Sequence, residues 1–155
     1  YNSSPSACEA ALETLREVMA GGPARNASGT ADASGRKIAI LGDMLELGRH
    51  TEEAHRNIGH IVAETCAALV AVGQRAQAIK EGALLKGMSE AAIFEFKDSS
   101  EAGKFLETFV QKGDIILIKG SQSMRMERVV EAILLDKENK NRLLVRQEKE
   151  WLEKK

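Results

Sequence analysis

Short apolar runs alternate with amphipathic segments along most of the chain. Each run is nearly continuous and ends at glycine or at a polar residue, which is typical of a strand covered on both faces. Each following segment spaces its apolar residues three and four apart, which indicates a helix with one buried face. These patterns predict strands at 37–41, 69–72, 92–96 and 114–120, and helices at about 6–19, 52–67, 75–86, 102–110 and 126–134.

Capping residues precede three of the predicted helices. Ser4 stands before Pro5, so its hydroxyl can accept from first-turn amides while proline takes a position whose amide needs no partner. Thr51 is expected to cap the second helix, and Ser99 or Ser100 the fourth.

The order of the elements predicts the fold class. Strand and helix alternate four times without a hairpin signal, so crossover helices must join the strands of a mainly parallel sheet. We therefore expect an α/β fold, a three-layer αβα sandwich with a Rossmann-like sheet of at least four strands. Residues 1–135 are assigned to this domain, and 136–155, with twelve charges, to a solvated helical tail whose Trp151 and Leu152 dock on it. The stretch 21–35 is rich in helix breakers and is expected to be a mobile surface loop.

Composition narrows the class of protein. The chain has 155 residues, enough for one domain with a full core, and its formal charge of −1 disfavours binding to nucleic acid or to an anionic membrane. It contains no apolar run long enough to span a bilayer and no export signal at its start. Cys8 and Cys66 are expected to be buried thiols in a reducing compartment, which favours the cytoplasm. We also expect the protein to be a monomer. Because the chain begins at Tyr1 without methionine, we expect it to be a domain of a longer protein.

Candidate chemistry lies where strands end, because ligands of open parallel sheets gather beyond the carboxyl ends of the strands. The first strand exits into Gly42–Gly48, which carries Asp43 and Glu46. The segment lacks the glycine spacing of a dinucleotide site and the Gly-Lys-Ser/Thr of a phosphate loop. In one interpretation Asp43 caps amides of the turn. In the other, Asp43 or Glu46 receives an ammonium group or a metal-bound water.

The fourth strand ends in Lys119, Gly120 and Ser121. An ammonium group, a hydroxyl and the amides of a following helix suit a carboxylate or phosphate, and glycine lets a ligand approach the backbone. Alternatively, Lys119 is exposed at a strand end and Ser121 or Ser123 caps the helix. We hypothesise that the ends of the first and fourth strands form one wall.

Zinc chemistry is not supported by the three histidines. His50, His55 and His60 are five residues apart, so on a helix they point in different directions, whereas chelation needs ligands on one face.

Several separate segments together carry a family resemblance. They are Tyr1-Asn2-Ser3-Ser4-Pro5, the string Leu-Gly-Asp-Met-Leu-Glu-Leu-Gly at 41–48, Val72-Gly73, and 113–121 followed by Met124-Arg125-Met126-Glu127. Over roughly residues 1–135 the chain resembles the carboxyl-terminal domain of the Mur ligases, in the branch that joins D-alanyl-D-alanine to UDP-N-acetylmuramoyl-tripeptide.

The resemblance implies a cytoplasmic ligase of peptidoglycan synthesis, and hence a role in cell shape and division. In that family ATP phosphorylates the tripeptide carboxylate, and the amine of D-alanyl-D-alanine attacks the acyl phosphate. The resemblance implies that ATP and Mg²⁺ bind mainly to a central domain that these residues do not match. This fragment alone is therefore expected to be inactive. It is also expected to hold no cofactor and no catalytic residue.

The family motifs also imply roles for individual residues. Ser4 stands where the family usually has asparagine, and Gln122 and Ser123 replace a common Arg-Gly pair, so an arginine contact to substrate would have to come from Arg125. The implied nucleotide-side residues are Tyr1 and Asn2, and the implied substrate-side residues are Asp43, Glu46, Lys119, Gly120, Ser121 and Arg125.

Two other classes compete with the ligase. A receiver-like phospho-acceptor domain would use Asp43, Asp98 and Lys119, but it needs an acidic pair at the first loop and five strands. A non-catalytic αβα binding module would present a large exposed apolar patch.

Overall fold

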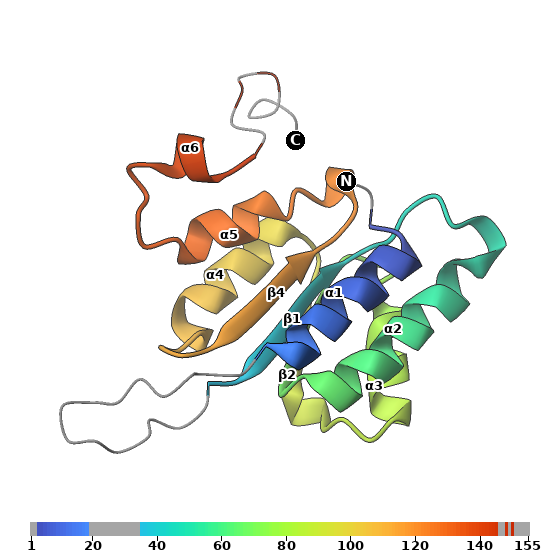
Figure 1. Cartoon of the computed structure of the whole chain (residues 1–155). Coiled ribbons are helices and arrows are strands. Elements are labelled where there is room, and N and C mark those ends of the chain that lie inside the picture. The colour runs from blue at the N-terminus through green and yellow to red at the C-terminus, as the bar shows by residue number, and fades with distance from the viewer. Residues whose placement is uncertain (1–2, 19–34, 146–147, 149, 151–155) are drawn as a thin grey trace, which may run out of the picture.

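The computed structural model describes residues 3–18, 35–145, 148 and 150, in which helices pack on both faces of one sheet (Figure 1). In chain order the elements are α1 (Pro5–Glu17), β1 (Lys37–Gly42), η1 (Gly48–His50), α2 (Thr51–Thr65), β2 (Ala68–Val72), α3 (Gln77–Leu85), η2 (Glu90–Ala92), β3 (Ile93–Phe96), α4 (Ser99–Phe109), β4 (Ile115–Lys119), η3 (Gln122–Met124), α5 (Glu127–Ile133) and α6 (Lys140–Leu143). Short 3₁₀ turns are labelled η.

The sheet is parallel throughout, as predicted. Within the described residues it contains four strands in the order β3-β2-β1-β4, and each pairing is parallel. The predicted α/β sandwich is therefore confirmed. β1 and β2 are the central strands and are buried, whereas every residue of the edge strand β4 is partly exposed. The apolar run of β4 had predicted a strand covered on both faces, but its place at the sheet edge leaves part of it open.

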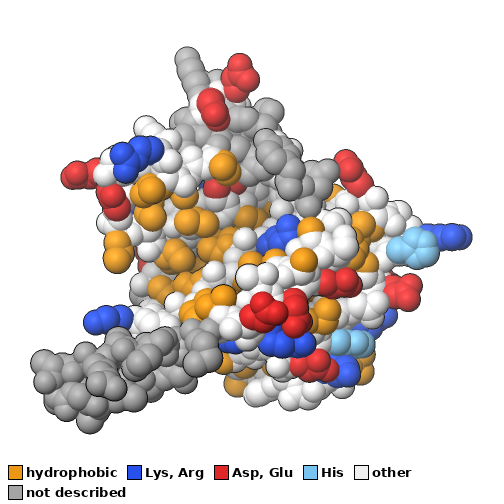
Figure 2. Space-filling view, viewed as in Figure 1, with side chains coloured by type: hydrophobic (Ala, Val, Ile, Leu, Met, Phe, Trp, Pro, Cys, Tyr) orange, Lys and Arg blue, Asp and Glu red, His pale blue; other side chains and the backbone are white. Residues whose placement is uncertain are grey.

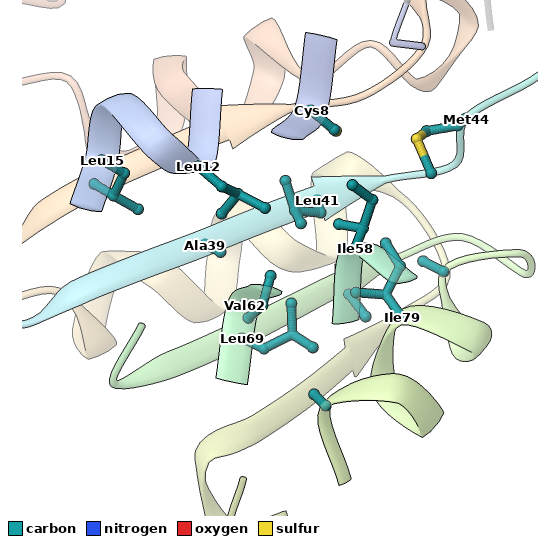
Figure 3. Packing of buried hydrophobic residues seen from close by; sticks show 13 residues of the cluster. Cys8, Leu12, Leu15, Ala39, Leu41, Met44, Ile58, Val62, Leu69 and Ile79 are labelled. Carbon is teal, nitrogen blue, oxygen red and sulfur yellow. The ribbon is translucent and has the colours of Figure 1, made fainter. Parts of the chain in front are cut away.

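One core lies between the sheet and helices α1, α2 and α3. Alternate residues of the central strands, among them Ala39, Leu41 and Leu69, point into it (Figure 3). Leu12 of α1 and Ile58 of α2 are fully buried against them. Because successive side chains of a strand point to opposite faces, the intervening residues must be covered by a second helical layer.

That second layer consists of α4 and α5. Ile38, Ile40 and Val70 of the sheet pack there with Leu106 of α4 and Val129 of α5. Phenylalanines close the outer part of this core, with ring centroids of neighbouring pairs 4.7 to 5.0 Å apart. The two cores account for the three layers that the sequence predicts.

Helices α2 and α3 approach each other closely through glycine. A Cβ on Gly59 of α2 would lie 2.0 Å from the carbonyl oxygen of Ile79, and one on Gly82 of α3 would lie 2.0 Å from that of Arg56. Because backbone atoms cannot move aside cheaply, both positions require glycine. The buried face of α2 is His55, Ile58, Gly59 and Val62, and Ala54 and Ile61 are partly buried beside it.

Helix starts agree with the sequence only in part. The Ser4 hydroxyl accepts the Ala7 amide at 3.2 Å, as predicted. Helix α4, however, is capped by Asp98, whose carboxylate accepts two amides, rather than by Ser99 or Ser100. Thr51 does not cap α2 either, because the η1 turn precedes the helix and the Thr51 hydroxyl donates to the Gly48 carbonyl at 2.7 Å.

Replacing Ser4 with alanine is expected to lower the free energy of unfolding of this chain by about 1 kcal/mol, because the Ala7 amide loses its acceptor. Ser4→Asn, which restores an acceptor, should retain nearly all of that stability. Urea unfolding of the two variants measures the difference, with Ser123→Ala at an exposed position as control. Equal losses in Ser4→Ala and Ser4→Asn would contradict the capping role.

Both cysteines are free, as predicted. Cys8 is buried in the first core, and Cys66 is half-buried at the end of α2. Burial raises the pKa of the Cys66 thiol to about 12, which keeps it protonated at neutral pH.

Parts of the predicted tail and loop lie outside the described residues. This applies to Trp151 and Leu152 and to 21–34 of the predicted surface loop. Within the described part of the tail, α6 spans Lys140–Leu143, and Glu150 is also helical. The Lys140 ammonium group pairs with Glu131 of α5 at 2.6 Å, which ties this turn to the domain.

Candidate functional site

The carboxyl ends of β1 and β4 lie side by side at the point where the strand order reverses. The chain runs outward from β1 through β2 to β3 and returns to place β4 on the other side of β1. Leu41 is in register with Lys119, so the loops that follow the two strands start together (Figure 1). The predicted proximity of these two strand ends is confirmed. In open α/β sheets such a switch point forms the crevice in which ligands bind.

The two loops are joined by hydrogen bonds in both directions. The Ser121 amide donates to the Asp43 carbonyl at 3.0 Å, and the Leu45 amide donates to the Ser121 hydroxyl at 2.8 Å. The backbones also approach closely, because a Cβ on Gly120 would lie 3.1 Å from the Cα of Gly42. The Ser121 hydroxyl therefore does not cap a helix, as one interpretation of the sequence expected, but holds the opposite loop.

The Asp43 carboxylate connects this wall to the loop after β2. It is buried, and its Oδ1 accepts the Ala76 amide at 2.9 Å. Its Oδ2 lies 3.7 Å from a guanidinium nitrogen of Arg75. The interpretation that Asp43 caps amides is thus the one that the structure supports, although the amide belongs to a neighbouring loop. The assignment of Asp43 to the substrate side stays a prediction.

Two residues of the wall have left-handed backbone conformations. Among the described residues other than glycine, positive φ occurs at Glu46, with 65°, and at Arg125, with 52°. Both come from the list of candidate residues, and each lies in one of the two joined loops. Such conformations cost energy and persist where the surroundings fix them, which is a common property of functional loops. Glu46 is exposed.

Lys119 lies beside a hollow of about 380 Å³ at the carboxyl end of β4. Gly120, Met126 and Leu144 are among the other residues that line it, so the described part of the tail forms one of its sides. In Figure 2 hydrophobic side chains gather on the side of the molecule that carries β4 and α5. Lys119 is partly exposed, and in the part of the chain that the structure describes its ammonium group forms no ion pair.

Arg125 follows η3 and is buried. Its Nε donates to the carboxylate of Glu127, which is also buried. The guanidinium group is thus bound within the protein, and Glu127 competes with any substrate carboxylate for it. A direct contact of Arg125 with substrate stays a prediction.

His55 was not predicted as part of the site, yet it supports the first loop. Its ring is fully buried, and its Nε2 accepts the Met44 amide at 2.9 Å. Its Nδ1 lies 2.6 Å from the Thr51 carbonyl oxygen. Burial lowers the pKa of His55, so the ring is neutral at physiological pH.

The residues implied on the nucleotide side, Tyr1 and Asn2, lie outside the described residues. The described residues also contain no group of three His, Cys, Asp or Glu side chains that could hold a metal ion. The sequence also has no Gly-Lys-Ser/Thr loop of the kind that binds ATP phosphates.

The fold and this wall match a known family. The sequence profile of "Mur ligase, glutamate ligase domain" matches residues 1–122, which is most of the chain. The chain belongs to the Mur ligase family. The match covers the four described strands, the loop after β1 and the loop after β4 as far as Gln122, so the family resemblance is confirmed.

Several relatives of this Mur ligase domain are named as ligases, and two of them have solved structures. The UDP-N-acetylmuramoyl-tripeptide–D-alanyl-D-alanine ligase of Bacillus subtilis is 29% identical over 135 residues, covering 86% of this chain and 26% of the relative. A crystal structure of the MurF ligase of Thermotoga maritima in complex with ADP has a TM-score of 0.61 at 27% identity, covering 92% of this chain and 28% of that one. A structure of MurF from Acinetobacter baumannii has a TM-score of 0.65 at 29% identity, over 86% and 26%. The chain thus spans about a quarter of the length of these relatives.

Family membership decides between the competing classes. A receiver-like domain would need Asp43 and Asp98 free to bind a cation, whereas both carboxylates accept backbone amides, Asp43 from Ala76 and Asp98 from the first turn of α4. The Mur ligase domain is the class that the sequence match supports.

No helix in the described ranges has both the length and the apolar character needed to cross a bilayer.

Proposed function

We propose that this chain is the carboxyl-terminal domain of an ATP-dependent ligase that adds D-alanyl-D-alanine to UDP-N-acetylmuramoyl-tripeptide in peptidoglycan synthesis. The observation that carries the proposal is the match of most of the chain to ligases named for that reaction. The solved relative that holds ADP supports ATP as the phosphoryl donor. The protein would act in the cytoplasm as a monomer, where its nucleotide-linked substrate is made available in solution.

In the proposed reaction the terminal phosphoryl group of ATP passes to the tripeptide carboxylate, which gives an acyl phosphate and ADP. The amine of D-alanyl-D-alanine then attacks the acyl carbon, the amide bond forms, phosphate leaves, and the amine loses a proton. This domain contributes by holding the amine at about 3 to 3.5 Å from its target and by excluding water when it closes over the ATP-binding domain.

The wall at the ends of β1 and β4 is suited to that task. Lys119 is partly exposed, so its ammonium group can attract the carboxylate of the dipeptide, and Gly120 leaves the backbone open to close approach. Asp43, Ser121 and His55 anchor the loop that carries Glu46, so this loop presents a fixed surface. Fixed polar groups around the reacting atoms lower the barrier because they need no rearrangement during the reaction.

The purified chain alone is expected neither to hydrolyse ATP nor to form the amide bond, because its sequence has no Gly-Lys-Ser/Thr loop and its described residues contain no group of three metal-ligating side chains. Full-length protein should release phosphate only when tripeptide substrate, dipeptide and ATP are all present. Both statements are tested by measuring phosphate release together with product formation, with the product detected by chromatography. Turnover by the isolated chain, or a full-length protein that accepts other amines equally well, would contradict the proposal.

A further inference from the structure

Three consecutive residues of the loop after β1 are each anchored to a different part of the domain. The Asp43 carboxylate binds the amide of Ala76 after β2, and the Leu45 amide binds the hydroxyl of Ser121 after β4. Between them, the Met44 amide donates to the ring of His55 in α2. The next residue is Glu46, whose left-handed backbone needs such support from its surroundings.

The two contacts of His55 require one form of its ring. Nε2 accepts the Met44 amide at 2.9 Å, so it must carry a lone pair. Nδ1 lies 2.6 Å from the Thr51 carbonyl oxygen, which can only accept, so Nδ1 must carry the proton. Only the neutral ring with its proton on Nδ1 satisfies both contacts. In the doubly protonated ring an N–H would face the Met44 N–H, and that amide would lose its acceptor.

Burial makes this difference costly. The His55 side chain is fully buried and Met44 is fully buried beside it, so water cannot replace the lost bond. The charged groups that act on the His55 ring are Asp43, on the loop that carries Met44, and Arg75, which follows β2. They lie 3.7 Å from each other and act on the ring in opposite directions, so neither alone decides its protonation.

We propose that His55 is a positioning residue of this site, which as a neutral ring fixes the 43–46 loop through the Met44 amide and on protonation releases it. The inference deepens the proposed function, because this loop is one side of the wall proposed to present the amine. His55 does not itself touch substrate. Release of the loop would also weaken the Leu45–Ser121 bond that joins the two sides of the wall.

The test compares the wild-type chain with His55→Gln and His60→Gln. The carboxamide of glutamine offers an oxygen near the position of Nε2 but does not titrate, so His55→Gln should keep the loop anchored at every pH. His60 lies on the same helix, is half-buried, and makes no hydrogen bond or ion pair in the described residues, which makes it a matched control. Nitrogen-15 NMR reports the ring tautomer, its titration and the exchange of single amides.

In the wild type and in His60→Gln we expect the proton of neutral His55 on Nδ1 and a ring that titrates below the usual histidine range. The exchange rates of the Met44 and Leu45 amides are divided by their intrinsic rates and compared with the core amide of Ile40. These relative rates should rise roughly tenfold when the pH is lowered from 7.5 to 5. In His55→Gln this local rise should be absent. A purely structural role would instead change the exchange of all core amides together.

Three results would overturn the inference: a proton on Nε2, a ring that titrates at the ordinary histidine pKa while the Met44 amide is unaffected, or the same acid response in His55→Gln. If His55→Gln does not fold, the tautomer and the titration of the wild-type ring decide alone. In the full-length enzyme, loss of kcat/KM for the amine below pH 6.5 should be smaller in His55→Gln than in the wild type. A loop that responds as expected in a protein without ligase activity would uphold the inference and contradict the proposed function only.

Discussion

Replacing Asp114 with alanine is expected to lower the free energy of unfolding by about 3 kcal/mol. The Asp114 side chain is only 3% exposed and receives two hydrogen bonds from the Arg36 guanidinium group, at 2.7 and 3.1 Å. It also accepts the amides of Arg36 and Gln111. The variant would remove this acceptor from the two amides and from the Arg36 Nε at the point where β1 and β4 begin, while the Arg36 Nη2 keeps the Phe109 carbonyl. Chemical denaturation measures the loss.

Two comparisons define the cause. Asp136→Ala, in the exposed tail, removes a carboxylate that binds only Asn139 among the described residues, and it should change stability by less than about 0.5 kcal/mol. Burial raises the pKa of Asp114, but the hydrogen bonds from Arg36 and Gln111 outweigh burial and hold that pKa below its usual value. The stability it contributes is therefore fully present above the unfolded pKa near 3.9 and is lost as the pH falls through the lower folded pKa. A difference between wild type and Asp114→Asn that stayed constant down to pH 2 would contradict this account.

The parallel sheet could be predicted because its signals are local. The runs 37–41 and 69–72 are apolar at every position except Lys37, and each leads into glycine. This local pattern predicts a buried parallel strand whatever the neighbouring strands are. The exposure of β4 could not be predicted in this way. It depends on the order β3-β2-β1-β4, which places this strand at an edge, and the apolar pattern of a strand does not record its neighbours.

The candidate loops could be predicted, whereas the partners of their side chains could not. Asp43 and Ser121 do meet, but the partners of their polar atoms, Ala76 and Leu45, are 33 and 76 residues away in sequence. Arg125 was considered for substrate, yet its near neighbour Glu127 binds it because the left-handed turn brings the two side chains together.

His55 shows where a signal was present but was outweighed. His55, Ile58, Gly59 and Val62 follow the spacing of one helix face, and this is the buried face. Ile58 and Val62 mark this face by their apolar side chains, whereas a histidine and a glycine add little hydrophobicity to it. The close approach of α3 to Gly59, and the acceptor that Met44 needs, account for the burial of these two residues. A polar residue and a glycine in phase with a helical stripe can therefore mark buried contacts.

In the full-length enzyme, Lys119→Ala is expected to lower kcat/KM for D-alanyl-D-alanine at least tenfold, equivalent to about 1.4 kcal/mol. The physical reason is the loss of the ammonium group at the switch point, where the carboxylate of the incoming dipeptide would otherwise be attracted. Lys119 is in register with Leu41 and is partly exposed beside the hollow at the end of β4, so its removal opens no buried cavity. Steady-state kinetics with each of the three substrates varied in turn would locate the loss on the amine rather than on ATP or the tripeptide.

The matched control is Lys97→Ala, which removes the same group directly after β3, an outer strand of the same parallel sheet. Because the switch point lies between β1 and β4, loss of the Lys97 ammonium group should leave kcat/KM within about twofold of the wild type. Lys119→Arg keeps the charge but changes its shape, so partial recovery would indicate that charge is what the dipeptide requires. Wild-type kinetics in Lys119→Ala, or an equal loss in Lys97→Ala, would remove the ammonium group from the wall and leave Lys119 as an ordinary residue at the end of a strand.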